Sequence, residues 1–272
     1  MKESTMSINN PNFPAKGPEQ ETKYAPFCQT RRFFEITTLD VKMWHIQEYE
    51  HSPVPQSEIG LLHSGDTYVV RWAYRVAVTG RELNGQPSRH APQGRDRCCY
   101  FCWQGRDAPQ NEKGAAALLT VELDRENGPQ VRLSQGSEPP AFLGVFEGRM
   151  MVLKGRKGQQ PATTSRLFIV RGEEKREAYL FEVSASVRQL RSRASLVLVD
   201  TKRKKVYVWH GVRSQASTRD IARFAAKNVL KGGLEAMGLS PETQLQTIEQ
   251  IEGDECKEFF HCKSRMPSVF SP

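Results

Sequence analysis

One pattern occurs twice in the chain, as YFCWQG at residues 100–105 and as VYVWHG at residues 206–211. In both copies aromatic and apolar residues run up to a glycine, which is typical of a strand that ends in a turn. A segment with the apolar spacing of a helix follows each copy, over residues 111–123 and 218–230. The two copies are 106 residues apart, so we expect an internal repeat of one structural unit.

A second motif lies downstream of each predicted helix. GSE at residues 136–138 precedes Phe142, and GDE at residues 253–255 precedes Phe259 with identical spacing. Each unit therefore contains strands, a long helix, a further strand and a closing segment. This order predicts an α+β fold in which a central mixed sheet carries a long helix on one face.

The strands that open the two units are expected over residues 41–46 and 167–170. They are 126 residues apart, whereas the aromatic copies are 106 apart, so the first unit holds about 20 extra residues. The polar stretch 80–97, which contains both Pro and Gly, is the candidate for this insertion. We expect it to form a long exposed hairpin loop.

Domain boundaries follow from the repeat. We expect a first domain over residues 31–160 and a second over residues 161–262, each long enough to bury its own core. Residues 1–30 are a polar, proline-bearing tail or linker, and residues 263–272 are a second linker. The chain has no apolar run long enough for a transmembrane segment and no secretory signal, so we expect it to be cytosolic.

The chain carries a net charge of +8, and the excess lies in one block. Residues 149–213 contain 16 Lys and Arg against 5 Asp and Glu, while the rest is slightly acidic. This block favours an anionic partner such as a lipid headgroup, an acidic filament or nucleic acid. Within it, a predicted hairpin tip carries four consecutive cations, Lys202, Arg203, Lys204 and Lys205. Anionic lipid binding and an ordinary solvated turn are the two interpretations of this run. Nucleic acid is the weakest partner because no aromatic platform flanks it.

The cysteine and histidine patterns do not indicate a zinc or catalytic site. Cys98, Cys99 and Cys102 lack the second close pair of ligands that a tetrahedral zinc site needs, so we expect buried thiols. The six histidines are scattered, and no nucleophile motif or phosphate-binding loop accompanies them. We therefore predict a protein that is not an enzyme.

The motifs of the first unit together resemble those of a gelsolin/villin-type domain. The resemblance is carried, in order, by SGDTYVV at 64–70, FCWQG at 101–105, NEKGAAA at 111–117, VELD at 121–124 and GSE at 136–138. The second unit resembles a more divergent copy, through RLFIVRG at 166–172 and VYVWHG at 206–211. The resemblance implies two tandem gelsolin-like domains, each a mixed sheet flanked by one long and one short helix.

The resemblance also implies a function. It implies a non-enzymatic binding or scaffold module of the actin cytoskeleton that links actin filaments and membrane. The alternative is a calcium-regulated fragment that severs or caps actin filaments, in which calcium opens the domains and the long helix docks on actin. The implied partners are actin, other cytoskeletal proteins and an anionic phosphoinositide surface. The implied location is cytoplasmic, at the cytoskeleton and the cytoplasmic face of the plasma membrane.

Gelsolin-like domains hold calcium between a Gly-Asp turn and a glutamate of the long helix. The matching residues of the first unit are Gly65, Asp66 and Glu112, which the resemblance makes a carbonyl and two carboxylate ligands. A turn aspartate and a helix glutamate without a metal are the plain alternative. In the second unit the counterparts fall within residues 193–195 and at Thr218, which carry no carboxylate. We therefore expect one calcium ion, in the first domain only.

Some members of the family share a further calcium ion with actin through carboxylates that follow the long helix. Asp124 matches one of these positions, but Arg125 follows where an acidic residue is usual. Leu133 or Ser134 occupies the later position in place of a glutamate. We therefore expect calcium-driven severing to be weak or absent.

Overall fold

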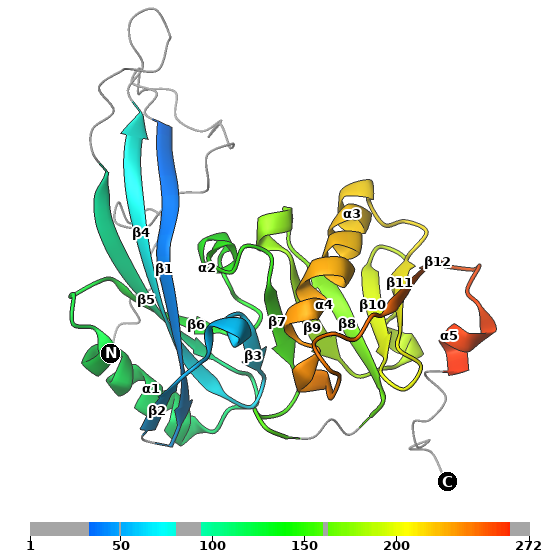
Figure 1. Cartoon of the computed structure of the whole chain (residues 1–272), viewed down its shortest axis with the longest axis horizontal. Coiled ribbons are helices and arrows are strands. Elements are labelled where there is room, and N and C mark those ends of the chain that lie inside the picture. Colours follow the sequence, from blue (N-terminus) through cyan, green and yellow to red (C-terminus); the bar gives the residue numbers. More distant parts are fainter. Residues whose placement is uncertain (1–32, 49, 80–93, 160–162, 262–272) are drawn as a thin grey trace, which may run out of the picture.

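The computed structural model describes residues 33–48, 50–79, 94–159 and 163–261. The predicted tail at 1–30, most of the predicted insertion at 80–97 and the linker at 263–272 lie outside the described residues. The described residues form two sheets that lie side by side, with helices on their faces (Figure 1). No helix in these ranges is long and apolar enough to cross a bilayer.

The first sheet has five strands in the order β2-β1-β4-β5-β6. Their bounds are Glu50–Pro53 for β2, Phe33–Gln47 for β1, Thr67–Thr79 for β4, Arg95–Gln104 for β5 and Gln130–Ser134 for β6. Neighbours are antiparallel except β5 and β6, which are parallel and are connected through α1 (Gln110–Leu123). The apolar stripe of α1, which includes Ala116 and Leu119, packs with Ile46 and Val69 of the sheet.

The second sheet has seven strands in the order β12-β11-β10-β8-β9-β7-β3. Their bounds are Gln246–Ile251, Lys205–His210, Ser195–Asp200, Ser165–Arg171, Tyr179–Val183, Met150–Leu153 and Leu61–His63, in that order. β3 and β7 lie before the predicted boundary at residue 160, and β7 pairs in parallel with β9 beyond it. The second sheet therefore includes two strands from the range predicted for the first domain.

Each unit has one long helix and one short helix among the described residues, and α1 is the long helix of the first unit. α3 (Ala216–Phe224), a π-helical turn (Ala225–Val229) and α4 (Leu230–Gly232) run across the seven-stranded sheet (Figure 1). A helix is predicted over 218–230, and the structure has a π turn within that range. The short helices are α2 (Pro140–Val145) and α5 (Lys257–His261). The predicted α+β class with mixed sheets is confirmed.

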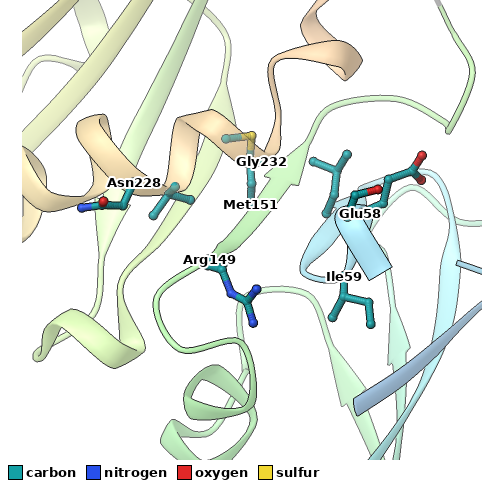
Figure 2. A pocket seen from close by; sticks show the side chains of 9 residues that line it. Glu58, Ile59, Arg149, Met151, Asn228 and Gly232 are labelled. Carbon is teal, nitrogen blue, oxygen red and sulfur yellow. The ribbon is translucent and has the colours of Figure 1, made fainter. Parts of the chain in front are cut away.

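Four short 3₁₀ helices occupy connections between these elements in the described part of the chain. They span Gln56–Glu58, Lys175–Glu177, Val187–Gln189 and Glu235–Met237. A small pocket lies beside the first of these helices, with Asn228 on one side, Glu58 and Ile59 on the other, and Arg149 and Met151 between them (Figure 2). Its volume of about 50 Å³ holds no more than a few water molecules. The two units are therefore closely packed at this part of their junction.

The repeat predicted from the sequence has a physical basis in both units. Trp103 donates from Nε1 to Glu138 Oε1 at 2.9 Å, and Trp209 donates from Nε1 to Glu255 Oε1 at 2.8 Å. Both indoles are almost fully buried, so each glutamate satisfies a polar group that water cannot reach. The phenylalanines that follow the two motifs, Phe142 and Phe259, are also fully buried. This shared bond explains why the aromatic pattern and the Gly-x-Glu motif recur together.

The three cysteines of β5 divide between the two faces of the first sheet. Cys102 packs in the cluster under α1 and Cys98 lies at its edge, whereas Cys99 lies in the main core on the other face. Cys99 and Cys102 are buried, as predicted, and Cys98 is half-buried. Burial raises the pKa of Cys99 to about 12 and that of Cys98 to about 11. Both thiols therefore stay protonated at neutral pH and are poor nucleophiles.

Candidate functional site

Asp66 lies in the turn between β3 and β4, and a segment from beyond β7 holds this turn. Gly65 N–H donates to the carbonyl of Gly155 at 2.8 Å, and Gly155 N–H donates to Ser64 Oγ at 3.1 Å. A Cβ at Gly65 would lie 2.7 Å from Arg156 Cγ and 2.9 Å from the Gly155 oxygen. Glycine is therefore required here because the two segments approach so closely.

The carboxylate of Asp66 is 1% exposed and is surrounded by donors. It accepts from the Lys157 backbone N–H at 2.7 Å, and His45 Nε2 lies 3.2 Å from Oδ2. Tyr68 OH donates weakly to the same oxygen at 3.4 Å. Burial alone raises the pKa of Asp66, but the His45 contact and the Lys157 N–H outweigh it and hold the pKa below its ordinary value. Asp66 is therefore a fixed negative charge.

Glu112 lies in the first turn of α1 and is 3% exposed. Its Oε1 accepts a charged hydrogen bond from Nη2 of Arg156, whereas its Oε2 has no hydrogen-bond partner among the described residues. An unpaired oxygen on a buried carboxylate is costly. This atom therefore favours a further cation or a water molecule beside it.

Arg156 brings the two predicted carboxylates together. Its Nε lies 3.3 Å from Asp66 Oδ1, and its Nη2 pairs with Glu112. These hydrogen bonds raise the pKa of Arg156, with the Glu112 bond as the largest cause. The structure thus places one guanidinium against both residues that the sequence assigns to calcium. In the sequence Arg156 is one member of the basic block, and no local pattern indicates this pairing.

Carboxylate oxygens are the kind of ligand that calcium prefers, and calcium takes six to eight oxygen ligands. Asp66 and Glu112 are both buried, and Glu112 Oε2 has an unused lone pair. The described residues contain no group of three or more His, Cys, Asp or Glu side chains arranged for a metal. Carbonyl oxygens and water would therefore have to complete the shell, and Arg156 already lies against both carboxylates.

The second unit has the same turn without the carboxylates. Gly105 N–H donates to the Asp66 carbonyl in the first unit, and Gly211 N–H donates to the Ala194 carbonyl in the second. Ala194 is therefore the structural counterpart of Asp66, as the sequence spacing predicts. In this unit Arg219, in the first turn of α3, donates to the Gly211 carbonyl at 3.2 Å. A protein cation thus lies at the start of both long helices.

The outer face of α1 carries two large apolar side chains. Leu118 is 73% exposed and Val121 is 61% exposed, and their three-residue spacing places them side by side. Gly114, one turn earlier, has no heavy atom within 4 Å of where its Cβ would lie. Residues outside the inner apolar stripe of the predicted helix already include Leu118 and Val121, so the sequence contained this signal.

Comparison with known proteins assigns the family. The family model for the gelsolin repeat matches residues 51–143. Bovine supervillin is 40% identical over 239 residues, which are 86% of this chain and 11% of that protein. The chain belongs to the gelsolin/villin superfamily. Mouse advillin is 33% identical over 190 residues, 67% of this chain and 21% of advillin.

Two features of this chain's sequence agree with the likeness to supervillin, namely the long insertion predicted in the first unit and the basic second unit. The chain spans only about a tenth to a fifth of the length of these two relatives. Among solved structures, the Thorarchaeota 2DGel3 complex with rabbit actin matches at 20% identity and a TM-score of 0.29. That match covers 82% of this chain and 99% of the other.

The position at which some gelsolin/villin members share calcium with actin is engaged internally in this chain. Asp124 Oδ1 accepts from the Gly128 N–H at 3.0 Å, and Oδ2 accepts from Gln130 Nε2 at 2.9 Å. Leu133 is 6% exposed and packs in the first core. Asp124 therefore stabilises the turn that ends α1, and the Leu133 side chain has no oxygen that could bind a metal.

Lys202, Arg203 and Lys204 of the basic run lie in the predicted turn between β10 and β11, and Lys205 is the first residue of β11. Arg203 pairs with Asp200 at 2.9 Å, and Lys205 pairs with Glu258 at 2.7 Å. Lys202 and Lys204 are exposed, and neither has an ion pair among the described residues. Half of the run is thus neutralised within the chain.

Three further cations of the basic block also have ion pairs. Lys157 Nζ lies 2.7 Å from Glu58, Arg156 contacts Asp66 and Glu112, and Arg166 pairs with Glu182. These pairs neutralise part of the positive charge of the block within the chain.

Proposed function

We propose that this chain is a non-enzymatic binding module of the actin cytoskeleton, in which α1 of the first unit contacts actin. The observation that carries the proposal is the exposed pair Leu118 and Val121 on the outer face of α1. In the family the long helix is the part that docks on actin. Buried in a partner, each side chain contributes about 1.5–3 kcal/mol. On the second unit's helix, α3 presents Asp220 and Arg223 to solvent, and the π-helical turn that follows presents Lys227.

Actin cosedimentation tests this contact. Changing Leu118→Ser together with Val121→Ser should weaken binding to actin by about 100-fold or more, because it removes the apolar centre of the surface. The matched control is Val187→Ser with Val212→Ser, since these side chains are 56% and 61% exposed in the second unit. Equal loss in both double variants, or no loss in either, would contradict a role for α1.

We further propose that the first unit binds one calcium ion through the Gly65 carbonyl, Asp66 and Glu112. The support is the pair of buried carboxylates, the unpaired Glu112 Oε2 and the absence of both carboxylates at Ala194 and Thr218. Titration calorimetry should find one ion in the wild type and none with Asp66→Ala. Two ions of equal affinity, or unchanged binding in the variant, would count against the site.

The second candidate is a calcium-regulated severing or capping fragment. It is favoured by the position of Glu112 on the same helix as Leu118, because calcium at the start of α1 could then act on the actin-facing surface. The internal bonds of Asp124 and the buried Leu133 oppose it. A pyrene-actin depolymerisation assay with and without calcium separates the two, and rapid calcium-dependent depolymerisation would favour the second candidate.

We also propose that the run Lys202, Arg203, Lys204 and Lys205 binds anionic phosphoinositide at a membrane, which would link actin filaments to the cytoplasmic face of the plasma membrane. The support is the exposed turn and the two cations, Lys202 and Lys204, for which the described residues provide no ion pair. Each basic group near an anionic surface contributes about 1 kcal/mol.

A further inference from the structure

We propose that Arg156 is a tethered competitor of calcium in the first unit, so that the metal can enter between Asp66 and Glu112 only when this side chain leaves. The inference rests on the calcium site of the proposed function. It adds a regulatory residue that the donor set alone does not reveal.

The backbone around Arg156 positions its side chain at the site. The Gly155 carbonyl accepts a hydrogen bond from the Gly65 N–H, and its own N–H donates to Ser64 Oγ. On the other side, the Lys157 N–H donates to Asp66 at 2.7 Å. Arg156 is thus held between two anchored neighbours at the edge of the β3–β4 turn. Its guanidinium reaches across to Glu112 on α1 from there. In the absence of metal, this bridge connects the first turn of α1 to the segment that follows β7.

The charges at the site make a shared occupancy unfavourable. One guanidinium neutralises only one of the two carboxylate charges, so the pair still attracts a cation, and Glu112 Oε2 remains unpaired. A calcium ion between the same oxygens would lie against the guanidinium, and the two cations would repel each other. The oxygens that Arg156 uses, Asp66 Oδ1 and Glu112 Oε1, are also among those the metal needs.

The difference in exposure shows which group can move. The Arg156 side chain is 41% exposed, while those of Asp66 and Glu112 are 1% and 4% exposed. Arg156 can therefore swing into solvent without opening the core, and the carboxylates stay in place. Without calcium, the Arg156 side chain connects α1 to the segment that follows β7. With calcium bound, the metal would instead connect α1 to the β3–β4 turn.

The experiment compares calcium binding by the full chain and by Arg156→Gln, using titration calorimetry and thermal melting. We expect the substitution to raise calcium affinity by about tenfold or more, because the competing charge is gone. In EDTA the variant should melt below the wild type, and calcium should raise its melting temperature more than it raises that of the wild type. Arg149→Gln is the matched control, since Arg149 lies just before β7 and its side chain donates to the Phe146 carbonyl, away from both carboxylates.

A second variant guards against misfolding. Arg156→Lys keeps a cation on the tether, so it should retain the weaker calcium binding of the wild type. Equal calcium affinity in the wild type and Arg156→Gln would overturn the competition while leaving the calcium site intact. Loss of calcium binding in every variant, including Arg156→Gln, would overturn the site itself. Actin binding by α1 is measured separately and does not depend on either result.

Discussion

The two units of this chain share a framework and differ at the start and outer face of the long helix. Both bury a tryptophan that donates to the glutamate of a Gly-x-Glu motif, as Trp103 with Glu138 and as Trp209 with Glu255. The first unit then places Asp66, Glu112 and Arg156 around the start of α1, whereas the second has Ala194 and Arg219 around the start of α3. The repeated fold thus rests on residues in the core, while the features on which we base calcium and actin binding lie in the first unit.

The difference extends to the helix surfaces. α1 presents Leu118 and Val121 to solvent, and α3 presents charged and polar side chains. Both helices nevertheless cover a sheet with an apolar inner stripe. A helix needs only that stripe to fold onto the sheet, so its outer face can change without loss of the fold. The two units can therefore differ in partners while they share an architecture.

The largest expected effect on stability comes from removing the buried tryptophan that both units share. Trp103→Ala and Trp209→Ala should each lower the free energy of unfolding by about 3–5 kcal/mol, because each leaves a cavity in the core and removes the hydrogen bond from the indole to the glutamate. Denaturant unfolding followed by circular dichroism and tryptophan fluorescence measures this. Since β3 and β7 join the second sheet, we expect one transition for both units in either variant. A variant in which one unit melts alone would show that the units are independent.

Buried histidines give a smaller, pH-dependent effect in both units. Burial lowers the pKa of His63 to about 4, and it also lowers that of His210, which contacts Ser195 Oγ at 2.9 Å. The unfolded chain therefore binds more protons than the native state once the pH falls below about 6.5, and stability decreases from there towards pH 4. For His63 the loss amounts to about 3 kcal/mol.

Thermal melting between pH 7 and pH 4 in EDTA checks this prediction. His63→Asn should flatten the pH dependence relative to the wild type, and His210→Asn should flatten it as well. His51→Asn is the control, because that side chain is exposed. An unchanged pH profile in His63→Asn would contradict a neutral buried imidazole in the first unit.

The smallest expected effect concerns the basic turn of the second unit. Lys202→Ala with Lys204→Ala should weaken binding to phosphoinositide vesicles by about 2 kcal/mol at low salt, and the difference should shrink as salt is added. The control is Lys205→Ala, since Lys205 already pairs with Glu258. Equal cosedimentation of the wild type and the double variant would leave the run as a solvated turn.

The spacing of apolar and charged residues along the sequence predicted the positions of several elements to within a few residues. The aromatic periodicity of residues 100–105 placed the end of β5, which extends from Arg95 to Gln104. The apolar spacing over 111–123 placed α1, which begins one residue earlier. The four consecutive cations at 202–205 between two apolar segments predicted the β10–β11 turn. These features depend on neighbours within a few residues, so they are readable along the chain.

Two other features could not be predicted in this way. The strands β3 and β7 look like parts of the first unit in the sequence, yet they pair into the second sheet. Arg156 looks like one member of a basic block, yet it pairs with Asp66, 90 residues earlier, and with Glu112, 44 residues earlier. The spacing of Arg156 from these partners follows no helix or strand period, so the sequence contains no sign of the contact.

The sequence alone thus determined the repeat, the class of fold, the family resemblance and the two carboxylates at the start of the first long helix. Tertiary structure decided that a single guanidinium lies against both carboxylates, that the second sheet draws strands from both units, and that half of the basic turn is neutralised. The reason is physical: periodicity and turn chemistry act between near neighbours, whereas sheet order and charge pairing depend on which distant segments the folded chain brings within a few ångströms.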